Sequence, residues 1–89
     1  MIFVLLYKFR KKLTKEIMEQ YSKVVQALME KSGLRPIANY WVLARCDGIG
    51  IFEGPNAESM LKYSMAVSEM AEGETMVAFP REEAVKLID

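Results

Sequence analysis

Histidine is absent from this 89-residue sequence, and cysteine occurs once, as Cys46. Without histidine the chain cannot build a Cys-His nucleophile pair, a His-ligated haem site or the usual zinc centres of Cys and His. One thiol cannot form a disulfide within the chain, which favours a reducing, cytoplasmic setting. We therefore expect no metal and no cofactor.

The sequence also lacks net charge and a long hydrophobic run. Its 12 basic and 12 acidic residues cancel, so bulk electrostatics would not draw it to nucleic acid or to an anionic membrane. The most apolar stretch, residues 2–9, is too short to cross a bilayer. Basic residues follow this stretch rather than precede it, unlike in a secretory signal. The expected partners include neither nucleic acid nor a membrane.

Apolar residues, in contrast, are abundant. They make up 52 % of the chain and include seven methionines. A chain of this length forms one small domain, residues 1–89, which buries only about 60 to 65 % of the surface that its unfolded chain exposes. The composition supplies more apolar surface than such a core can hide, and this excess predicts self-association.

Periodicity and breakers divide the chain into strands and helices. Thr14 is a good N-cap for an amphipathic helix that ends at Ser32 and Gly33, and Asn56 is a good N-cap for a second one. The expected strands are 2–9, 37–44, 49–54 and 75–79. The expected helices are 15–32, 57 to about 70 with Glu72 and Gly73 as its end, and a short tail helix at 81–88.

The stretch from residue 40 to residue 55 holds the best hairpin signal, with Arg45-Cys46-Asp47-Gly48 between two apolar runs. An Asp-Gly pair in this position is typical of a turn, because Gly adopts positive φ without strain and Asp bonds the nearby backbone. Gly50 and Gly54 in the second arm indicate a bulge or the close approach of another segment.

The order strand, helix, strand, strand, helix, strand predicts a ferredoxin-like α+β fold: a four-stranded antiparallel sheet, two helices on one face and a short C-terminal helix. The first strand is apolar on both faces, with Phe3, Leu5, Tyr7 and Phe9 on one and Ile2, Val4 and Leu6 on the other. Two helices cover only one face, so the other needs a partner. We expect a homodimer that packs sheet against sheet as a dimeric α+β barrel, with further assembly open.

Three segments of the chain resemble the GYD domain family. They are residues 40–47 (Tyr-Trp-Val-Leu-Ala-Arg-Cys-Asp), 52–55 (Phe-Glu-Gly-Pro) and 74–79 (Glu-Thr-Met-Val-Ala-Phe). The family has a Gly-x-Tyr-Asp-like turn, a strand ending Glu-Ala-Pro and a last strand Glu-Thr-x-x-Ala-Phe. Ala44 and Cys46 depart from it, standing where the family has Gly and Tyr. The resemblance covers nearly the whole chain and implies a dimeric α+β barrel of undefined biochemical function.

The chain is also similar, more distantly, to the stand-alone ligand-binding module of Lrp/AsnC-type regulators. That module carries a Gly-x-Tyr-Asp turn before its third strand and a Glu-Thr pair in its last strand. The resemblance implies binding of an amino acid or related effector, and assembly beyond a dimer.

Five side chains are candidate ligand-binding residues: Tyr7, Asn39, Trp41, Asp47 and Glu53. Asn39 and Trp41 lie two apart on one strand and share a face, where an amide can orient a ligand and an indole can stack on it. The same pair also suits a dimer interface. Asp47 has an alternative role in bonding the turn backbone, and Glu53 has one in a salt bridge at a strand end.

Cys46 lies beside Arg45, which can lower a thiol pKa, but a structural or exposed thiol is the simpler interpretation.

No catalytic residue can be named from the sequence. The first functional hypothesis is a small-molecule-binding or assembly module. The alternatives are a cofactor-independent monooxygenase or isomerase acting on a small apolar substrate, and an effector-binding subunit. An enzyme predicts an enclosed apolar pocket within each protomer that has an amide or a carboxylate at its wall.

Overall fold

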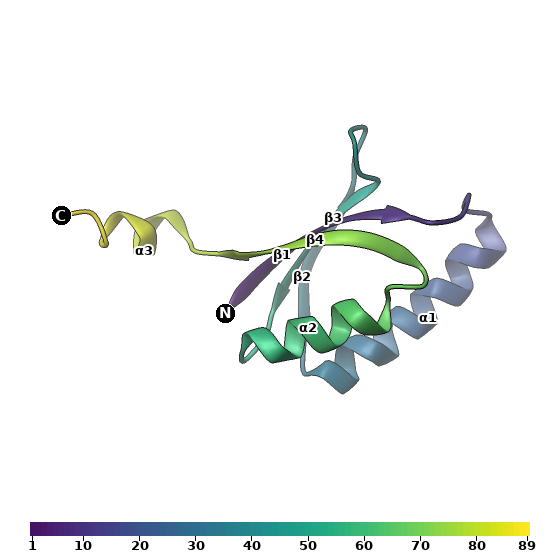
Figure 1. The fold of residues 1–89 in the computed structure, drawn as a ribbon, viewed down its shortest axis with the longest axis horizontal. Coiled ribbons are helices and arrows are strands. Elements are labelled where there is room, and N and C mark those ends of the chain that lie inside the picture. The colour runs from purple at the N-terminus through teal and green to yellow at the C-terminus, as the bar shows by residue number, and fades with distance from the viewer.

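The computed structural model describes all 89 residues as four strands and three helices (Figure 1). The strands are β1 (Ile2–Phe9), β2 (Arg35–Trp41), β3 (Gly48–Glu53) and β4 (Ala71–Ala78). The helices are α1 (Lys15–Ser32), α2 (Ala57–Ala66) and α3 (Arg81–Val85). None of the helices combines the length and the apolar character needed to span a membrane.

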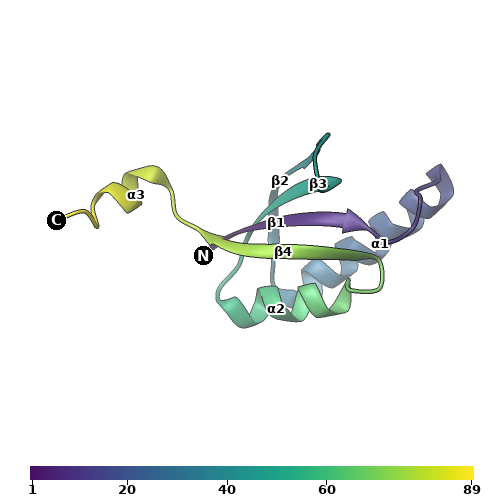
Figure 2. The ribbon, with the colours of Figure 1, turned by 45° about the horizontal axis from the view of Figure 1, so that its top comes forward.

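The four strands form one antiparallel sheet in the order β2-β3-β1-β4. Helices α1 and α2 lie on one face of this sheet, and no helix lies on the other (Figures 1 and 2). This is the ferredoxin-like α+β fold that the order of elements predicted, and the prediction is confirmed. Helix α3 stands away from the body, at the end of an extended segment beyond β4.

Both long helices begin where their N-cap signals lie, and α1 also ends at its predicted glycine. The Thr14 Oγ1 atom accepts a hydrogen bond from the backbone N–H of Ile17 at 3.1 Å, and Asn56 Oδ1 accepts one from Ser59 at 2.9 Å. These side chains satisfy amides that have no partner within the first turn of a helix. Gly33 ends α1 with φ of 72°, a left-handed conformation that strains any residue with a Cβ.

The register of β1 sends alternate side chains to opposite faces of the sheet. Phe3 and Leu5 face the helices and are 1 % and 7 % exposed, whereas Val4 and Leu6 lie on the open face and are only half-buried. The buried core is small, and it consists of Phe3, Leu5, Leu34, Phe52, Met60, Tyr63 and Val67. The open face is therefore apolar but uncovered within one chain.

The predicted hairpin turn at residues 45–48 is wrong in its details. Strand β2 ends at Trp41, and residues 42–47 form a six-residue loop before β3 begins at Gly48. Gly33 is the one glycine with positive φ, so Gly48 has extended backbone within the sheet. The reason for a glycine there is steric, because a Cβ at Gly48 would overlap the ring of Tyr7. Gly54 also lies close to another segment, because a Cβ added at this position would be 2.6 Å from the Leu34 side chain.

The second helix and the last strand also differ from the prediction. Helix α2 ends at Ala66, and Glu72 and Gly73 lie inside β4 rather than at a helix end. The eight residues of β1 pair with β4 along their whole length, from Ile2 with Ala78 to Phe9 with Ala71, so β4 extends four residues further back than its apolar pattern indicated. The tail helix α3 covers only Arg81–Val85, and all of its side chains are exposed.

Candidate functional site

A pocket of about 630 Å³ lies between the sheet and helices α1 and α2. The buried core fills the end of this layer around Phe3 and Met60, and the pocket occupies the end around Tyr7 and Phe9. Small residues on the helix-facing side of the sheet leave room for it, among them Ala71, Gly73 and Thr75. Most of the lining is apolar, and the β2 side of the pocket is open to solvent.

Tyr7 and Asn39 form the polar centre of this pocket. The Tyr7 hydroxyl donates a hydrogen bond to Asn39 Oδ1 at 2.6 Å. The two residues are on β1 and β2, which are separated by β3, so the Tyr7 ring must cross β3 to reach its partner. It crosses at Gly48, the residue paired with both Tyr7 and Trp41, where the missing side chain leaves a path.

Burial raises the pKa of the Tyr7 phenol above its ordinary value, and the neighbouring Asn39 and Trp41 side chains oppose part of this shift. The phenol is therefore protonated at neutral pH and acts as a hydrogen-bond donor. Because the phenol proton occupies the carbonyl oxygen of Asn39, the Asn39 amide nitrogen keeps its N–H groups available for an oxygen atom of a ligand.

An aromatic cluster closes the same end of the pocket around Phe9. The Phe9 ring lies 5.4 Å from that of Tyr7, 6.4 Å from that of Tyr21 on α1 and 6.2 Å from that of Trp41 on β2, centre to centre. Three elements thus each contribute flat apolar surface to one place. Trp41 remains 59 % exposed, so its indole is accessible to a ligand.

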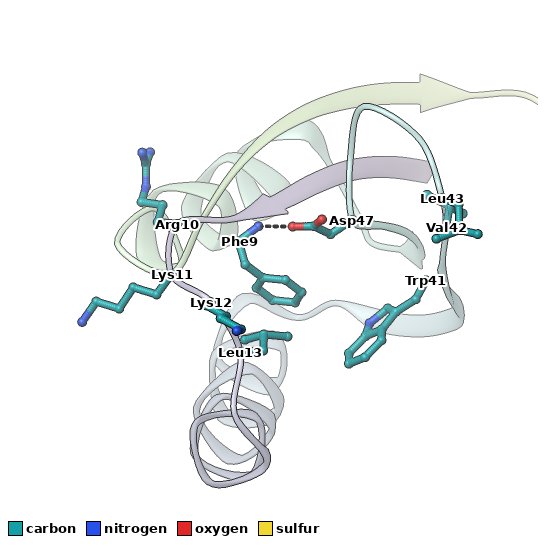
Figure 3. A pocket seen from close by; sticks show the side chains of 9 residues that line it. All are labelled: Phe9, Arg10, Lys11, Lys12, Leu13, Trp41, Val42, Leu43 and Asp47. Carbon is teal, nitrogen blue, oxygen red and sulfur yellow. Dashed lines mark hydrogen bonds between the residues drawn. The ribbon is translucent and has the colours of Figure 1, made fainter.

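A second cleft, of about 560 Å³, lies next to this aromatic cluster between the start of α1 and the loop after β2. Figure 3 shows Phe9 and Leu13 on one side of it and Trp41 on the other, with Lys12 beside Leu13. The Asp47 carboxylate points to Phe9 and accepts a hydrogen bond from its backbone N–H at 2.8 Å. The Asp47 side chain therefore bonds the neighbouring strand, while the turn is bonded by the Asp47 backbone carbonyl, which accepts from the Val42 N–H at 2.9 Å.

The structure brings Tyr7, Asn39 and Trp41 together in one pocket, but it places Glu53 elsewhere. Glu53 pairs with Ile2 and Arg35 at the opposite end of the sheet, on the open face. Its carboxylate lies 2.9 Å from the Arg35 guanidinium, which holds the pKa of Glu53 below its ordinary value. Cys46 lies half-buried in the loop between β2 and β3 as a free thiol.

The sequence model of the GYD domain matches residues 3–88. The chain belongs to the GYD domain family. Among solved structures, this GYD protein is similar to the protein SCO4226 from Streptomyces coelicolor A3(2), with 15 % identity, a TM-score of 0.59 and coverage of 88 % of this chain and 98 % of that one. It is also similar to 30S ribosomal protein S6 from Thermotoga maritima, with 12 % identity, a TM-score of 0.52 and coverage of 96 % and 94 %. At these identities the likeness shows the fold alone, and a comparison with curated proteins finds no match.

Sequence reasoning on this GYD protein missed three residues that shape the pocket, namely Phe9, Arg10 and Tyr21. Phe9 lies two positions after Tyr7 and so shares its face, which was a usable signal. Tyr21 belongs to the apolar stripe of α1, where a core residue and a pocket residue look alike in sequence. Arg10 stood out only as part of a basic connection, and its place depends on the path of the chain between β1 and α1.

Proposed function

We propose that this GYD protein is a homodimeric binding protein for a small, largely apolar molecule, held between the sheet and helices α1 and α2. The pocket of about 630 Å³ carries this proposal, because its volume falls within the range of roughly 300 to 1,000 Å³ of small-molecule sites. Its lining combines apolar walls with one hydrogen-bonded polar pair, Tyr7 and Asn39. Such a pair orients a ligand while the walls supply affinity.

The pocket has the groups that ligand binding requires, but we assign no general base for catalysis in it. Tyr7 keeps its proton at neutral pH, so it does not serve as a base. Glu72 is the carboxylate in the lining, and it lies exposed with its oxygen 3.9 Å from the Arg10 guanidinium. We therefore assign a binding role to Tyr7, Asn39 and Trp41 and no catalytic residue. The monooxygenase or isomerase hypothesis stays a prediction, as does the likeness to the Lrp/AsnC module.

A pair of variants on α1 tests the pocket. Val25 lines the pocket, whereas the adjacent Val24 is 47 % exposed and does not line it. Val25→Phe should fill the site, and Val24→Phe adds the same ring outside it. The probe is octanamide, a neutral apolar amide, and the readout is the NMR shift of the Trp41 indole N–H and the Asn39 amide. We expect octanamide to shift both signals in the wild type and in Val24→Phe, and neither in Val25→Phe.

Absence of any octanamide-dependent shift in the wild type would overturn the binding proposal. Equal binding by both phenylalanine variants would also do so, because it would place the amide outside the pocket. Mass spectrometry of the purified protein under native conditions would add the identity of any molecule that copurifies with it.

The open face of the sheet supports the dimer. Its centre is apolar, with Val4 and Leu6 on β1 flanked by Ile49 and Ile51 on β3. Tyr40 and Met76 extend the apolar surface and are 60 % and 45 % exposed. A second copy packed face to face would bury this patch and add to a core of only seven residues.

Substitution at the centre of the open face tests the dimer. Ile51 lies between Val4 and Ala38 in the sheet, so Ile51→Glu would place two charges in a two-fold interface. We expect sedimentation analysis at micromolar concentration to show a wild-type dimer and an Ile51→Glu monomer, with Val24→Glu on α1 as a dimeric control. A wild-type monomer would contradict the dimer, and a larger assembly would favour the effector-module hypothesis. The single free thiol supports a reducing, cytoplasmic location for this dimer.

A further inference from the structure

We propose that the ligand of this pocket is an organic acid, with its apolar body between the sheet and the helices and its anionic group in the adjacent cleft beside Lys12, Lys11 and Arg10. The inference rests on the proposed binding function and narrows its ligand to one chemical class. Three observations support it: the two cavities share lining residues, the cleft has excess positive charge, and the lysines there take part in no ion pair.

The pocket and the cleft share three lining residues, Phe9, Arg10 and Trp41. A molecule that stacks on the exposed Trp41 indole therefore lies at the boundary between an apolar interior and a basic exterior. The pocket and cleft measure about 630 and 560 Å³, so together they have room for a molecule with two chemically different ends. The shared wall makes one amphipathic ligand a better fit than two separate ones.

Arg10, Lys11 and Lys12 are the only three consecutive residues of like charge in a chain with no net charge. Lys11 and Lys12 take part in no ion pair, since the ion pairs of the chain are Arg10 with Glu72 and Arg35 with Glu53. Arg10 is anchored by a 2.7 Å hydrogen bond from its Nε to the Ser68 carbonyl oxygen. This bond holds the guanidinium at the mouth of the pocket.

Two carboxylates face these three cations, Asp47 in the cleft and Glu72 at the pocket mouth. Asp47 is already bonded to the backbone N–H of Phe9, and Glu72 lies 3.9 Å from Arg10. One positive charge remains in excess, on two exposed lysines that take part in no ion pair. Figure 3 shows Lys12 beside Leu13, while Arg10 and Lys11 are directed away from Trp41. Lys12 is therefore the first contact, and Lys11 reaches an anion by changing rotamer.

The experiment compares three probes of one length and different charge: octanoate, octanamide and octylammonium. Affinity is measured from the fluorescence of Trp41, which is the only tryptophan in the chain. At low ionic strength we expect octanoate to bind roughly two- to fivefold more tightly than octanamide, as an exposed charge pair provides, and octylammonium to bind more weakly than both. This preference should shrink at about 0.5 M salt because screening acts on exposed charges.

The double variant Lys11→Gln, Lys12→Gln should bind octanoate and octanamide equally, with its affinity for octanamide unchanged. The control is Lys15→Gln, Lys23→Gln, which removes two exposed α1 charges outside both cavities. Equal affinity of the wild type for octanoate and octanamide would overturn the acid proposal and leave the binding function intact. Failure of octanamide itself to bind would count against the binding function instead. An octanoate preference that survives in the Lys11, Lys12 variant would place the anion elsewhere and also overturn the proposal.

Discussion

The carboxylate of Asp47 accepts a hydrogen bond from the backbone N–H of Phe9, and the backbone N–H of Asp47 donates to the carbonyl oxygen of Tyr7, each at 2.8 Å. Phe9 and Tyr7 belong to β1, whereas Asp47 ends the loop between β2 and β3. The Asp47 side chain thus extends the hydrogen bonding between β1 and β3 to the residue that precedes β3. It fixes the loop against the strand that carries the pocket residues.

Asp47→Ala removes a hydrogen bond to a charged acceptor and leaves the Phe9 N–H without its partner. We expect a loss of about 1 to 2 kcal/mol in the free energy of unfolding, measured by urea titration. Asp47→Asn keeps a neutral acceptor and should lose less. The octanamide affinity should hold in both variants, because Asp47 does not line the inner pocket. Unchanged stability of Asp47→Ala would show that this bond does not hold the loop.

Gly48→Ala tests the path of Tyr7 across β3. A Cβ at residue 48 would overlap the Tyr7 ring, so either the ring or the strand must move. We expect a loss of roughly 1 to 3 kcal/mol. In a Tyr7→Ala background the same change should cost close to nothing, and a double-mutant cycle measures this coupling. Additive losses would contradict the crossing.

Tyr7→Phe keeps the ring and removes the hydrogen bond to Asn39. The expected loss of stability is about 0.5 to 1.5 kcal/mol, as for a typical hydrogen bond within a protein. Octanamide should also bind more weakly, because the Asn39 amide is no longer oriented. Asn39→Ala should weaken binding to a similar degree, and the double variant should be no worse than Asn39→Ala alone. A Tyr7→Phe variant with wild-type affinity would limit Tyr7 to a structural role.

Tyr63 gives a pH dependence with a defined sign. Burial raises the pKa of its phenol from 10.0 to about 12 in the folded protein. Below pH 10 both folded and unfolded states are protonated, and between pH 10 and 12 only the unfolded state ionises, so stability falls as pH rises. The loss is on the order of 2 to 3 kcal/mol. Urea titrations between pH 10 and 12 should show that the free energy of unfolding declines more steeply with pH for the wild type than for Tyr63→Phe. Parallel declines would contradict the raised pKa of Tyr63.

How far the sequence predicts this structure depends on the range of the interactions involved. The caps at Thr14, Gly33 and Asn56 act within one turn of a helix, and their sequence signals located the helix boundaries correctly. Gly48 led to the wrong turn prediction. A glycine looks the same in the sequence whether it forms a turn or leaves room for a distant side chain, here that of Tyr7, 41 positions earlier. Strand β4 was too short in the prediction because Glu72 and Gly73 have no intrinsic strand preference and are held by pairing with β1.

The same distinction between local and long-range interactions decides which residues of the candidate site could be predicted. Asn39 and Trp41 share a face through strand geometry alone, so their association was predictable. Their proximity to Tyr7 depends on the strand order and on the Tyr7 ring crossing β3. Neither can be predicted from the local sequence pattern. Glu53 could join them only in a suitable register, and the register instead places it at the other end of the sheet in a salt bridge with Arg35.

The pocket occupies space that a larger core would fill, in a protein with only seven buried hydrophobic residues. A ligand that binds the folded state at a hundred times its dissociation constant adds roughly 2.7 kcal/mol to the free energy of unfolding, a large share of what so small a domain possesses. Proteases act on the unfolded population, so under the proposed binding function the lifetime of the protein in the cell should lengthen when the ligand is abundant and shorten when it is scarce. The protein level would then report ligand supply without any dedicated regulator.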